Sequence, residues 1–228
     1  MKKIMFNDRY GLTRAVLTGE KTMTRRLVTM TLHKKMKDGT MKPIIPDDMF
    51  IAHDGTAHFK VGRNGYMVPK ENQPQYHLDE YVAVAQKYWD LRRDDTFYKA
   101  LAKADPTFPL ECIRGEAGCN NKMFVKAAWM PYHIHITDIK VERLQDISDE
   151  DIMREGIMEG DFMNTWDRFY YDEWGDVANH ITFKTRREAF ASLIDKVSGK
   201  GTWERNPWVY VYSFKVYRFN EHYALSYG

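Results

Sequence analysis

A lysine, a threonine and two arginines stand close together near the N-terminus, and side chains of these types could carry out chemistry. They are Lys21, Thr24, Arg25 and Arg26. Side chains three positions apart meet on one face of a turn or helix, whereas in a strand Lys21 and Thr24 would point to opposite faces. A lysine beside a hydroxyl acts as a base only if its pKa falls well below about 10.4, through burial or a nearby cation. A lysine that keeps its charge would instead hold a phosphate, and a solvated basic turn is the third interpretation.

Charges are unevenly distributed along the chain, although the formal net charge is only +2. From Lys21 to Lys42, seven lysines and arginines accompany one acid, Asp38. From Glu142 to Asp176, acids outnumber bases twelve to three. This pattern indicates either a phosphate-facing surface beside an acidic one or a flexible basic loop.

Metal-ligating residue types are present but are poorly spaced for a metal site. His133 and His135 lie two positions apart in a predicted strand, so one face of that strand could offer both rings to a metal. No third ligand accompanies them, and Cys112 and Cys119 lack the CxxC spacing of a structural zinc site. We therefore expect no metal and no other cofactor.

The elements on either side of segment 19–26 decide where its side chains point. A cap at Asn7 or Asp8 predicts a helix that runs to about Thr18. Gly19 then occupies the position where helices commonly end in a left-handed residue. The sequence therefore predicts that segment 19–26 is a tight turn that leads into an extended segment.

Hydrophobic periodicity and turn signals predict the remaining elements. The predicted strands cover 3–6, 57–62, 66–68, 81–86, 133–141 and 207–216, and the predicted helices cover 90–104, 148–156 and 185–197. The strongest helix signal is the capping box that Thr185 and Glu188 can form. Strands scattered among helices, without regular βαβ alternation, favour an α+β fold over a doubly wound sheet.

The segment from Thr18 to Arg26, with the sequence TGEKTMTRR, resembles the G-x-K-x-x-T-x-R signature of the ASCH superfamily, which is related to the RNA-binding PUA fold. Further segments resemble the larger phage and prophage members of that family. They are the Phe6-Asn7-Asp8 start of the first helix, the strand 80–86, the run 143–151 with the following Glu155-Gly156, and the strand 206–211. The resemblance covers roughly residues 4–29, 76–90 and 123–217.

The resemblance implies the architecture of the whole chain. ASCH members are built on a small PUA-like β-barrel with flanking helices, so we expect this barrel within an α+β fold. Residues 1–228 would form one ASCH-like domain. The segments at about 30–76 and 90–122 would be insertions into the minimal barrel.

The resemblance also implies a polar cleft around the signature turn. An ASCH-type protein would bind RNA or a modified nucleoside there, around Lys21, Thr24 and Arg26. Gly19, Arg25 and Arg26 would contact the substrate or the nucleic acid. This binding function is the primary expectation from the sequence.

The alternative is catalysis in the same cleft. A small bacterial member of the superfamily hydrolyses the amide of acetylated cytidine with a Lys, a Thr and a Glu, which fall on Lys21, Thr24 and Glu155 here. The Thr24 hydroxyl would attack the acetyl carbonyl with Lys21 as base, and Glu155 would orient Lys21 or protonate the departing amine. Arg26 would contact an anion or the carbonyl. This chain departs from the shorter members at Gln86, where many of them carry a carboxylate.

A third possibility is a phage-derived assembly factor without catalysis.

Composition limits the kinds of protein that this chain could be. Its 228 residues suffice for one core, and no stretch approaches the roughly 20 apolar residues that span a bilayer. Charged residues interrupt the N-terminus before a signal-peptide core could form, and two cysteines fit a reducing compartment. We therefore expect a cytoplasmic protein without a membrane partner, and the sequence predicts no particular protein partner.

Overall fold

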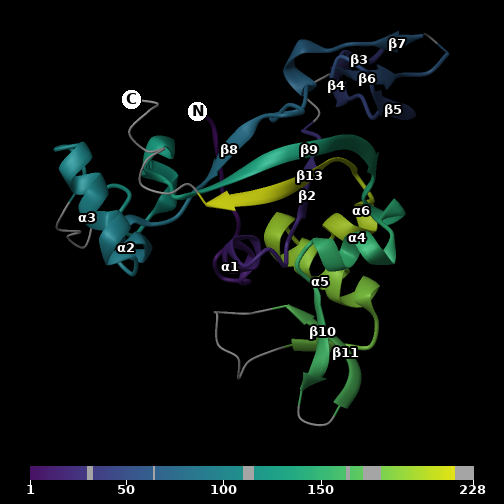
Figure 1. Ribbon diagram of the computed structural model, residues 1–228. Coiled ribbons are helices and arrows are strands. Elements are labelled where there is room, and N and C mark those ends of the chain that lie inside the picture. The colour runs from purple at the N-terminus through teal and green to yellow at the C-terminus, as the bar shows by residue number, and fades with distance from the viewer. Residues whose placement is uncertain (30–32, 64, 110–115, 163–164, 172–180, 219–228) are drawn as a thin grey trace.

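The computed structural model is shown in Figure 1. It describes residues 1–29, 33–63, 65–109, 116–162, 165–171 and 181–218.

A five-stranded mixed sheet is the centre of the fold, in the order β1-β8-β9-β13-β2. Its strands are β1 (Lys3–Ile4), β2 (Met23–Leu27), β8 (Tyr81–Val84), β9 (Tyr132–Arg143) and β13 (Trp208–Arg218). β1 pairs with β8 in parallel, and the other neighbours are antiparallel. The predicted mixture of helices and strands is confirmed. Within the described residues no pairing between β1 and β2 closes this sheet into a barrel.

The two longest strands form because their residues alternate in polarity. In β9 the apolar Ile134 and Ile136 are buried and alternate with His133 and His135. Such alternation places one set of side chains on the core face and the other on the opposite face. β13 pairs with β9 over its whole length, with a register shift between Ser213 and the next residue. These strands were predicted at 133–141 and 207–216, and both predictions are confirmed.

The N-terminal helix is shorter than predicted. α1 (Leu12–Leu17) begins after Gly11, whose φ of 65° lies in the left-handed region, and not at Asn7 or Asp8. The Asp8 carboxylate instead accepts hydrogen bonds from the Thr13 hydroxyl (2.5 Å) and the Lys122 amine (2.6 Å). The helix therefore starts one turn late, because the chain must first bend at Gly11.

The helices near β2 follow their capping signals. α4 (Asp149–Arg154) begins at the Ser148 cap and ends with Glu155 before Gly156, as predicted. α5 (Arg186–Ser198) begins at the capping box of Thr185 and Glu188. α6 (Thr202–Arg205) follows it. None of the helices in the described ranges is long and apolar enough to cross a membrane.

Residues from the predicted first insertion form two small sheets. Their strands are β3 (His33–Lys35), β4 (Met41–Pro43), β5 (Asp48–Ile51), β6 (Ala57–Lys60) and β7 (Tyr66–Met67). β6 and β7 lie within the strands predicted at 57–62 and 66–68, and they pair with each other antiparallel. Figure 1 shows these strands on the far side of β9 from α1, α4 and α5. The insert therefore leads away from segment 19–26.

The predicted helix at 90–104 is divided into two. α2 (Tyr88–Leu91) ends early, and α3 (Asp95–Ala104) starts at Asp94, whose side chain caps it. These helices pack in a hydrophobic cluster of their own. The cluster comprises Ala83, Ala85, Tyr88, Leu91, Phe97, Tyr98, Leu101, Phe108, Cys119, Val125, Trp129 and Met130. Cys119 is disulfide-bonded, so the interpretation of the two cysteines as a sign of a reducing compartment is wrong, and the cytoplasmic location stays a prediction.

The remaining elements are short. A separate sheet contains β10 (Met158–Phe162), β11 (Thr165–Tyr171) and β12 (Ile181–Phe183), and the 3-10 helices are η1 (Lys70–Asn72), η2 (Lys122–Phe124), η3 (Ala127–Trp129) and η4 (Leu144–Asp146). The main core lies between the central sheet, α1, α4 and α5. Its fully buried side chains include Val16, Val82, Val84, Ile134, Ile136, Ile152 and Phe190.

Candidate functional site

The signature segment is a short turn followed by a strand. Gly19 has a φ of 81°, which ends α1 in the left-handed conformation that the sequence predicts. The Lys21 amide then donates to the Ala15 carbonyl (2.8 Å), and β2 begins two residues later, at Met23. The predicted turn over 19–26 is therefore too long. Because Lys21 precedes the strand, it does not follow the alternation that would separate it from Thr24.

Lys21 and Glu155 meet inside the protein. The Lys21 side chain lies among residues that exclude water, and only 2% of its surface is exposed. Its Nζ donates to Glu155 Oε2 (2.5 Å) and to the Glu155 carbonyl (2.7 Å). Burial lowers the pKa of Lys21, and the Glu155 carboxylate opposes this shift without cancelling it. The contact joins residues 134 positions apart.

Arg25 is held in an internal network of carboxylates. Its guanidinium donates to Glu142 Oε1 (2.5 Å), Glu155 Oε1 (2.9 Å) and Asp151 Oδ2 (3.2 Å). Burial alone would lower the pKa of Arg25, but Glu155 and Glu142 outweigh it and raise that pKa. Arg25 therefore has three internal acidic partners, and its expected contact with a substrate or nucleic acid stays a prediction. Lys140 joins this network through its ion pairs with Glu142 and Asp151.

Thr24 and Arg26 come from the opposite face of β2 to Arg25, because they alternate with it along the strand. Thr24 is buried and stands opposite Tyr212 in β13. Arg26 donates from Nη2 to the Met5 carbonyl (2.8 Å), and its guanidinium lies 5.6 Å from the centre of the Phe6 ring. The buried Nε of Arg26 has no hydrogen-bond partner within the described part of the chain.

These side chains line one cavity of about 410 Å³. The predicted residues Lys21, Thr24, Arg25, Arg26 and Glu155 all contribute to its wall, whereas Gly19 does not. No hydrogen bond among the described residues joins the Thr24 hydroxyl to Lys21 or Glu155. The cavity therefore brings the amine, the hydroxyl and the carboxylate to one place, with only the amine and the carboxylate in direct contact.

An apolar wall from α5 faces the polar side chains. It consists of Phe190, Leu193, Ile194 and Val197. The capping box predicts this helix, but no local signal shows that it packs over β2. The Arg25 network was also missed, although the acidic first turn of α4 and the alternation of β9 offered Asp151 and Glu142 as candidates.

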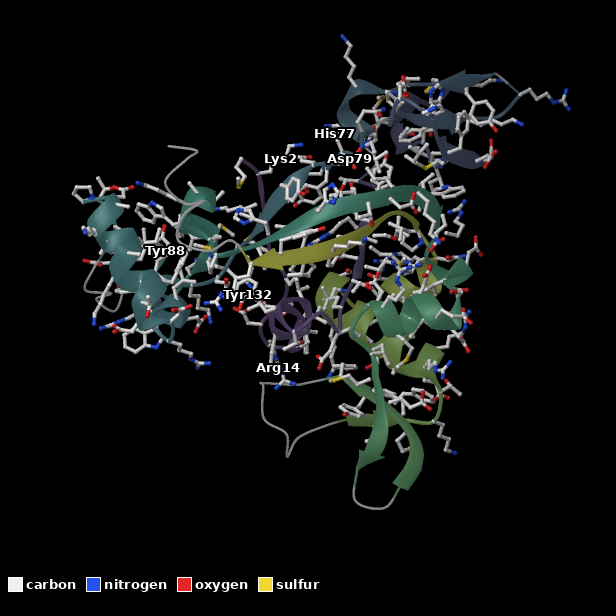
Figure 2. All side chains as sticks on the ribbon, in the orientation of Figure 1. Lys2, Arg14, His77, Asp79, Tyr88 and Tyr132 are labelled. Atoms are coloured by element: carbon white, nitrogen blue, oxygen red, sulfur yellow. The ribbon has the colours of Figure 1, made fainter. Side chains whose placement is uncertain are left out.

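Gln86 faces a different and larger cavity, of about 790 Å³. Arg14 and Tyr132, which Figure 2 labels, belong to the wall of this second cavity. The buried Gln86 Oε1 lacks a hydrogen-bond partner among the described residues. Gln86 therefore takes no part in the cavity that contains Lys21.

The two histidines of β9 differ in environment. Burial lowers the pKa of His133 to about 4, so its ring is neutral near neutral pH. His135 lies beside Asp79, with 3.3 Å between His135 Nε2 and Asp79 Oδ1. Within the described ranges, no group of three or more His, Cys, Asp or Glu side chains could hold a metal ion.

Comparisons with known proteins add no family or relative: no family model, no curated protein and no solved structure matches this chain. The resemblance to the ASCH superfamily therefore rests on the motifs quoted above.

Proposed function

We propose that the cavity around Lys21 binds a nucleoside carrying an acyl amide and hydrolyses that amide. The observation that carries the proposal is the buried contact between Lys21 Nζ and Glu155 Oε2 in a cavity that Thr24 also lines. A titratable group with a pKa shifted by burial and a specific charged partner, inside a cleft, is typical of catalytic sites. The acetyl group of acetylated cytidine is the simplest acyl group of this kind.

Lys21 is the base in this proposal. A base must be able to lose its proton near neutral pH, and desolvation shifts the pKa of Lys21 in that direction. Glu155 limits the shift, because a nearby carboxylate favours the ammonium form. The balance resembles that of other enzymes in which burial tunes a lysine toward neutrality.

The reaction needs only groups in the cavity and one water. Thr24 Oγ1 attacks the acyl carbonyl carbon and gives its proton to the neutral Lys21 amine. The carbonyl thereby becomes a tetrahedral oxyanion. This intermediate collapses, the C–N bond breaks, and the departing amine takes the proton from Lys21. Water then attacks the acyl-threonine ester with Lys21 again as base, which releases the acid and restores the hydroxyl. The guanidinium of Arg26 is the candidate partner for the oxyanion.

Of the two roles left open for Glu155, orienting Lys21 is the better supported. Glu155 Oε2 accepts from Lys21, and Glu155 Oε1 accepts from Arg25 at 2.9 Å. Both carboxylate oxygens therefore already accept from cations. A group held in this way positions the amine, whereas a proton donor to the leaving group would need a protonated oxygen directed at the substrate.

The size and lining of the cavity suit a nucleoside. Small-molecule sites usually measure about 300–1,000 Å³ and combine apolar walls with a few placed polar groups. Here α5 supplies the apolar wall and β2 the polar one. The PUA-like barrel of the ASCH type is part of the same proposal. The long pairing of β9 with β13 and its register shift after Ser213 support the barrel, because a register shift of this kind bends a strand.

Turnover of acylated nucleosides tests the proposal. Purified protein is incubated with acetylated cytidine and a small panel of N-acylated nucleosides, and acid release is followed by chromatography. We expect wild-type turnover, and loss of at least about a hundredfold in Thr24→Val and Lys21→Met, because each removes a reacting group. Asp95→Asn, in an exposed ion pair of α3, is the control. Turnover that survives Thr24→Val would exclude Thr24 as nucleophile.

Binding without catalysis is the second candidate. The unpartnered Nε of Arg26 favours it, since a ligand acceptor could satisfy that donor. This candidate predicts RNA or nucleoside binding in the same cavity, weakened by Arg26→Met, with no acid release from any acylated nucleoside. Absence of both binding and turnover would instead favour the assembly factor.

A further inference from the structure

Three aromatic rings gather on the face of the central sheet that is not part of the main core. Tyr81 of β8 stacks on His135 of β9, with ring centroids 4.6 Å apart and planes inclined by 16°. Tyr217 of β13 lies 5.9 Å from Tyr81 and 6.3 Å from His135. Three neighbouring strands therefore each contribute one ring.

The register of the sheet fixes this arrangement. Tyr81 stands opposite His135, which stands opposite Lys215. In the next row, Ala83 stands opposite His133, which stands opposite Tyr217. Residues directly opposite each other share a face. Ala83 and His133 are buried, so the exposed part of the two rows consists of Tyr81, His135, Lys215 and Tyr217. Since strands lie about 4.8 Å apart, each row of three residues spans roughly 10 Å.

The two tyrosine rings remain accessible although they contact His135 and each other, and the His135 side chain is 20% exposed. Tyr81 is 43% exposed and Tyr217 is 41% exposed, whereas Ile134 and Ile136 on the other face are fully buried. Exposed aromatic rings on an open sheet face are the surface on which the bases of single strands stack.

Cations border the rings. Lys215 is exposed, and within the described residues it has no acidic partner. Lys2, in contrast, pairs with Glu80 at 3.0 Å. Figure 2 shows Lys2, His77 and Asp79 grouped beside β8. A lysine without an acidic partner in the same row as two stacked rings places a phosphate contact next to a base contact.

Asp79 bends the chain just before β8. It has a φ of 61°, which non-glycine residues seldom adopt, and its amide donates to the Ile136 carbonyl (2.9 Å). This bend sets the Asp79 carboxylate beside the His135 ring. A carboxylate in this place repels phosphate but accepts from the N–H groups of a base, so it directs bases, and not the backbone, toward the rings.

We propose that the open sheet face formed by Tyr81, His135 and Tyr217, with Lys215 beside them, binds single-stranded RNA by base stacking. The inference goes beyond the proposed function, because it uses neither Lys21 nor Thr24. It commits to RNA and not to a protein, since stacked, exposed rings next to an unpaired cation complement a base and a phosphate.

The test uses the full chain and a short single-stranded RNA that carries the fluorescent base 2-aminopurine. Stacking on the rings should quench the fluorescence, and binding should weaken as salt rises. We expect Tyr81→Ala combined with Tyr217→Ala to raise the Kd about tenfold or more, whereas the matching double Phe variant keeps Kd within about twofold. Lys215→Met should reduce the slope of log Kd against log salt by about 0.7.

The controls separate this inference from the proposed function. Trp89→Ala removes an exposed aromatic side chain in α2 and should leave the Kd unchanged. Thr24→Val should abolish turnover without altering RNA binding, and the double Ala variant should retain nucleoside turnover. Three results would each overturn the proposal. They are wild-type protein that does not bind the RNA at low salt, wild-type protein that binds duplex RNA with equal affinity, and a double Ala variant that keeps full affinity. Salt-insensitive binding of a protein to this face would do the same.

Discussion

At the scale of single residues, the chemistry depends on the protonation of Lys21. Its amine must be neutral to act as a base, and burial lowers its pKa. Turnover should therefore rise with pH and level off below the ordinary lysine range. Glu155→Gln removes the carboxylate that raises the pKa of Lys21, so the rising limb of kcat/KM should move to lower pH. A limb that stays in place would show that Lys21 is not the titrating base.

The buried position of Arg25 predicts a large effect on stability. Arg25→Met leaves Glu142, Asp151 and Glu155 without their shared cation, and breaking a buried pair typically costs about 3–5 kcal/mol. Lys99→Met breaks an exposed pair with Asp95 and should cost less than about 1 kcal/mol. Urea unfolding measures both. Equal losses in the two variants would contradict the internal network.

His133 makes stability depend on pH. Its folded-state pKa of about 4 lies below the ordinary value of 6.5, so between these values the unfolded chain binds a proton that the folded chain does not. Stability should therefore fall as pH decreases from 6.5 toward 4. In His133→Gln this part of the fall should disappear, whereas His53→Gln, in the exposed part of the insert, should retain it. Chemical unfolding at several pH values gives the comparison.

At the scale of elements, the end of α4 positions the candidate site. Gly156 has a φ of 96°, and a Cβ there would meet Ala15, Leu12 and Lys21 at ordinary contact distances of 3.6 Å. Gly156→Ala should cost about 1–2 kcal/mol from backbone strain alone. Gly55→Ala should cost a similar amount, because that glycine has a φ of 81° and no near neighbour.

Turnover should distinguish these two variants. Gly156 follows Glu155 directly, so relief of strain there would move the carboxylate that holds Lys21. We expect Gly156→Ala to lower kcat on the order of tenfold to a hundredfold, since small misplacements are costly in catalysis. Gly55→Ala, in the insert that leads away from the cavity, should retain wild-type kcat. Equal kcat in both variants would show that the α4 terminus does not position Lys21.

Element prediction succeeded where a local signal exists. The capping box at Thr185 and the alternation of β9 depend on neighbours in sequence, and both elements were predicted close to their actual limits. It was inaccurate at Gly11 and at Asp94, where a bend or a cap interrupts a helix that periodicity alone would continue. β2 was taken for a turn, because its pairing with β13 is a long-range contact.

The candidate site also has a part that the sequence predicts and a part that depends on long-range contacts. The motif and the family resemblance pointed to Lys21, Thr24 and Glu155, and the structure places all three on one cavity. The acids that hold Arg25 come from β9 and α4, and no local spacing shows that these elements meet. The apolar α5 wall is likewise a result of tertiary packing.

At the scale of the whole molecule, the described residues form two separate hydrophobic clusters. Leu101 belongs to the smaller one with α2 and α3, whereas Leu144 belongs to the main core. Leu101→Ala should cost about 2–5 kcal/mol and increase hydrogen exchange mainly in α2 and α3. Leu144→Ala should instead increase exchange throughout the central sheet. Uniform exchange in both variants would mean that the clusters unfold as one unit.

The predicted single domain with two insertions stays a prediction at this scale. Residues 33–63 and 65–67 form small sheets that lead away from the cavity, and residues 88–109 and 116–130, with Ala83 and Ala85, carry the smaller cluster. Composition and turn signals could not show the direction of either segment, because it depends on contacts such as that between β5 and β9.

The most direct measurement is the mass of the protein during turnover of an acylated nucleoside. After rapid acid quenching, intact-protein mass spectrometry should detect an acyl adduct, and peptide mapping should locate it on Thr24. The adduct should be absent from Thr24→Val and Lys21→Met. Acid release without an adduct on Thr24, or an adduct that persists in Thr24→Val, would contradict the proposed covalent mechanism.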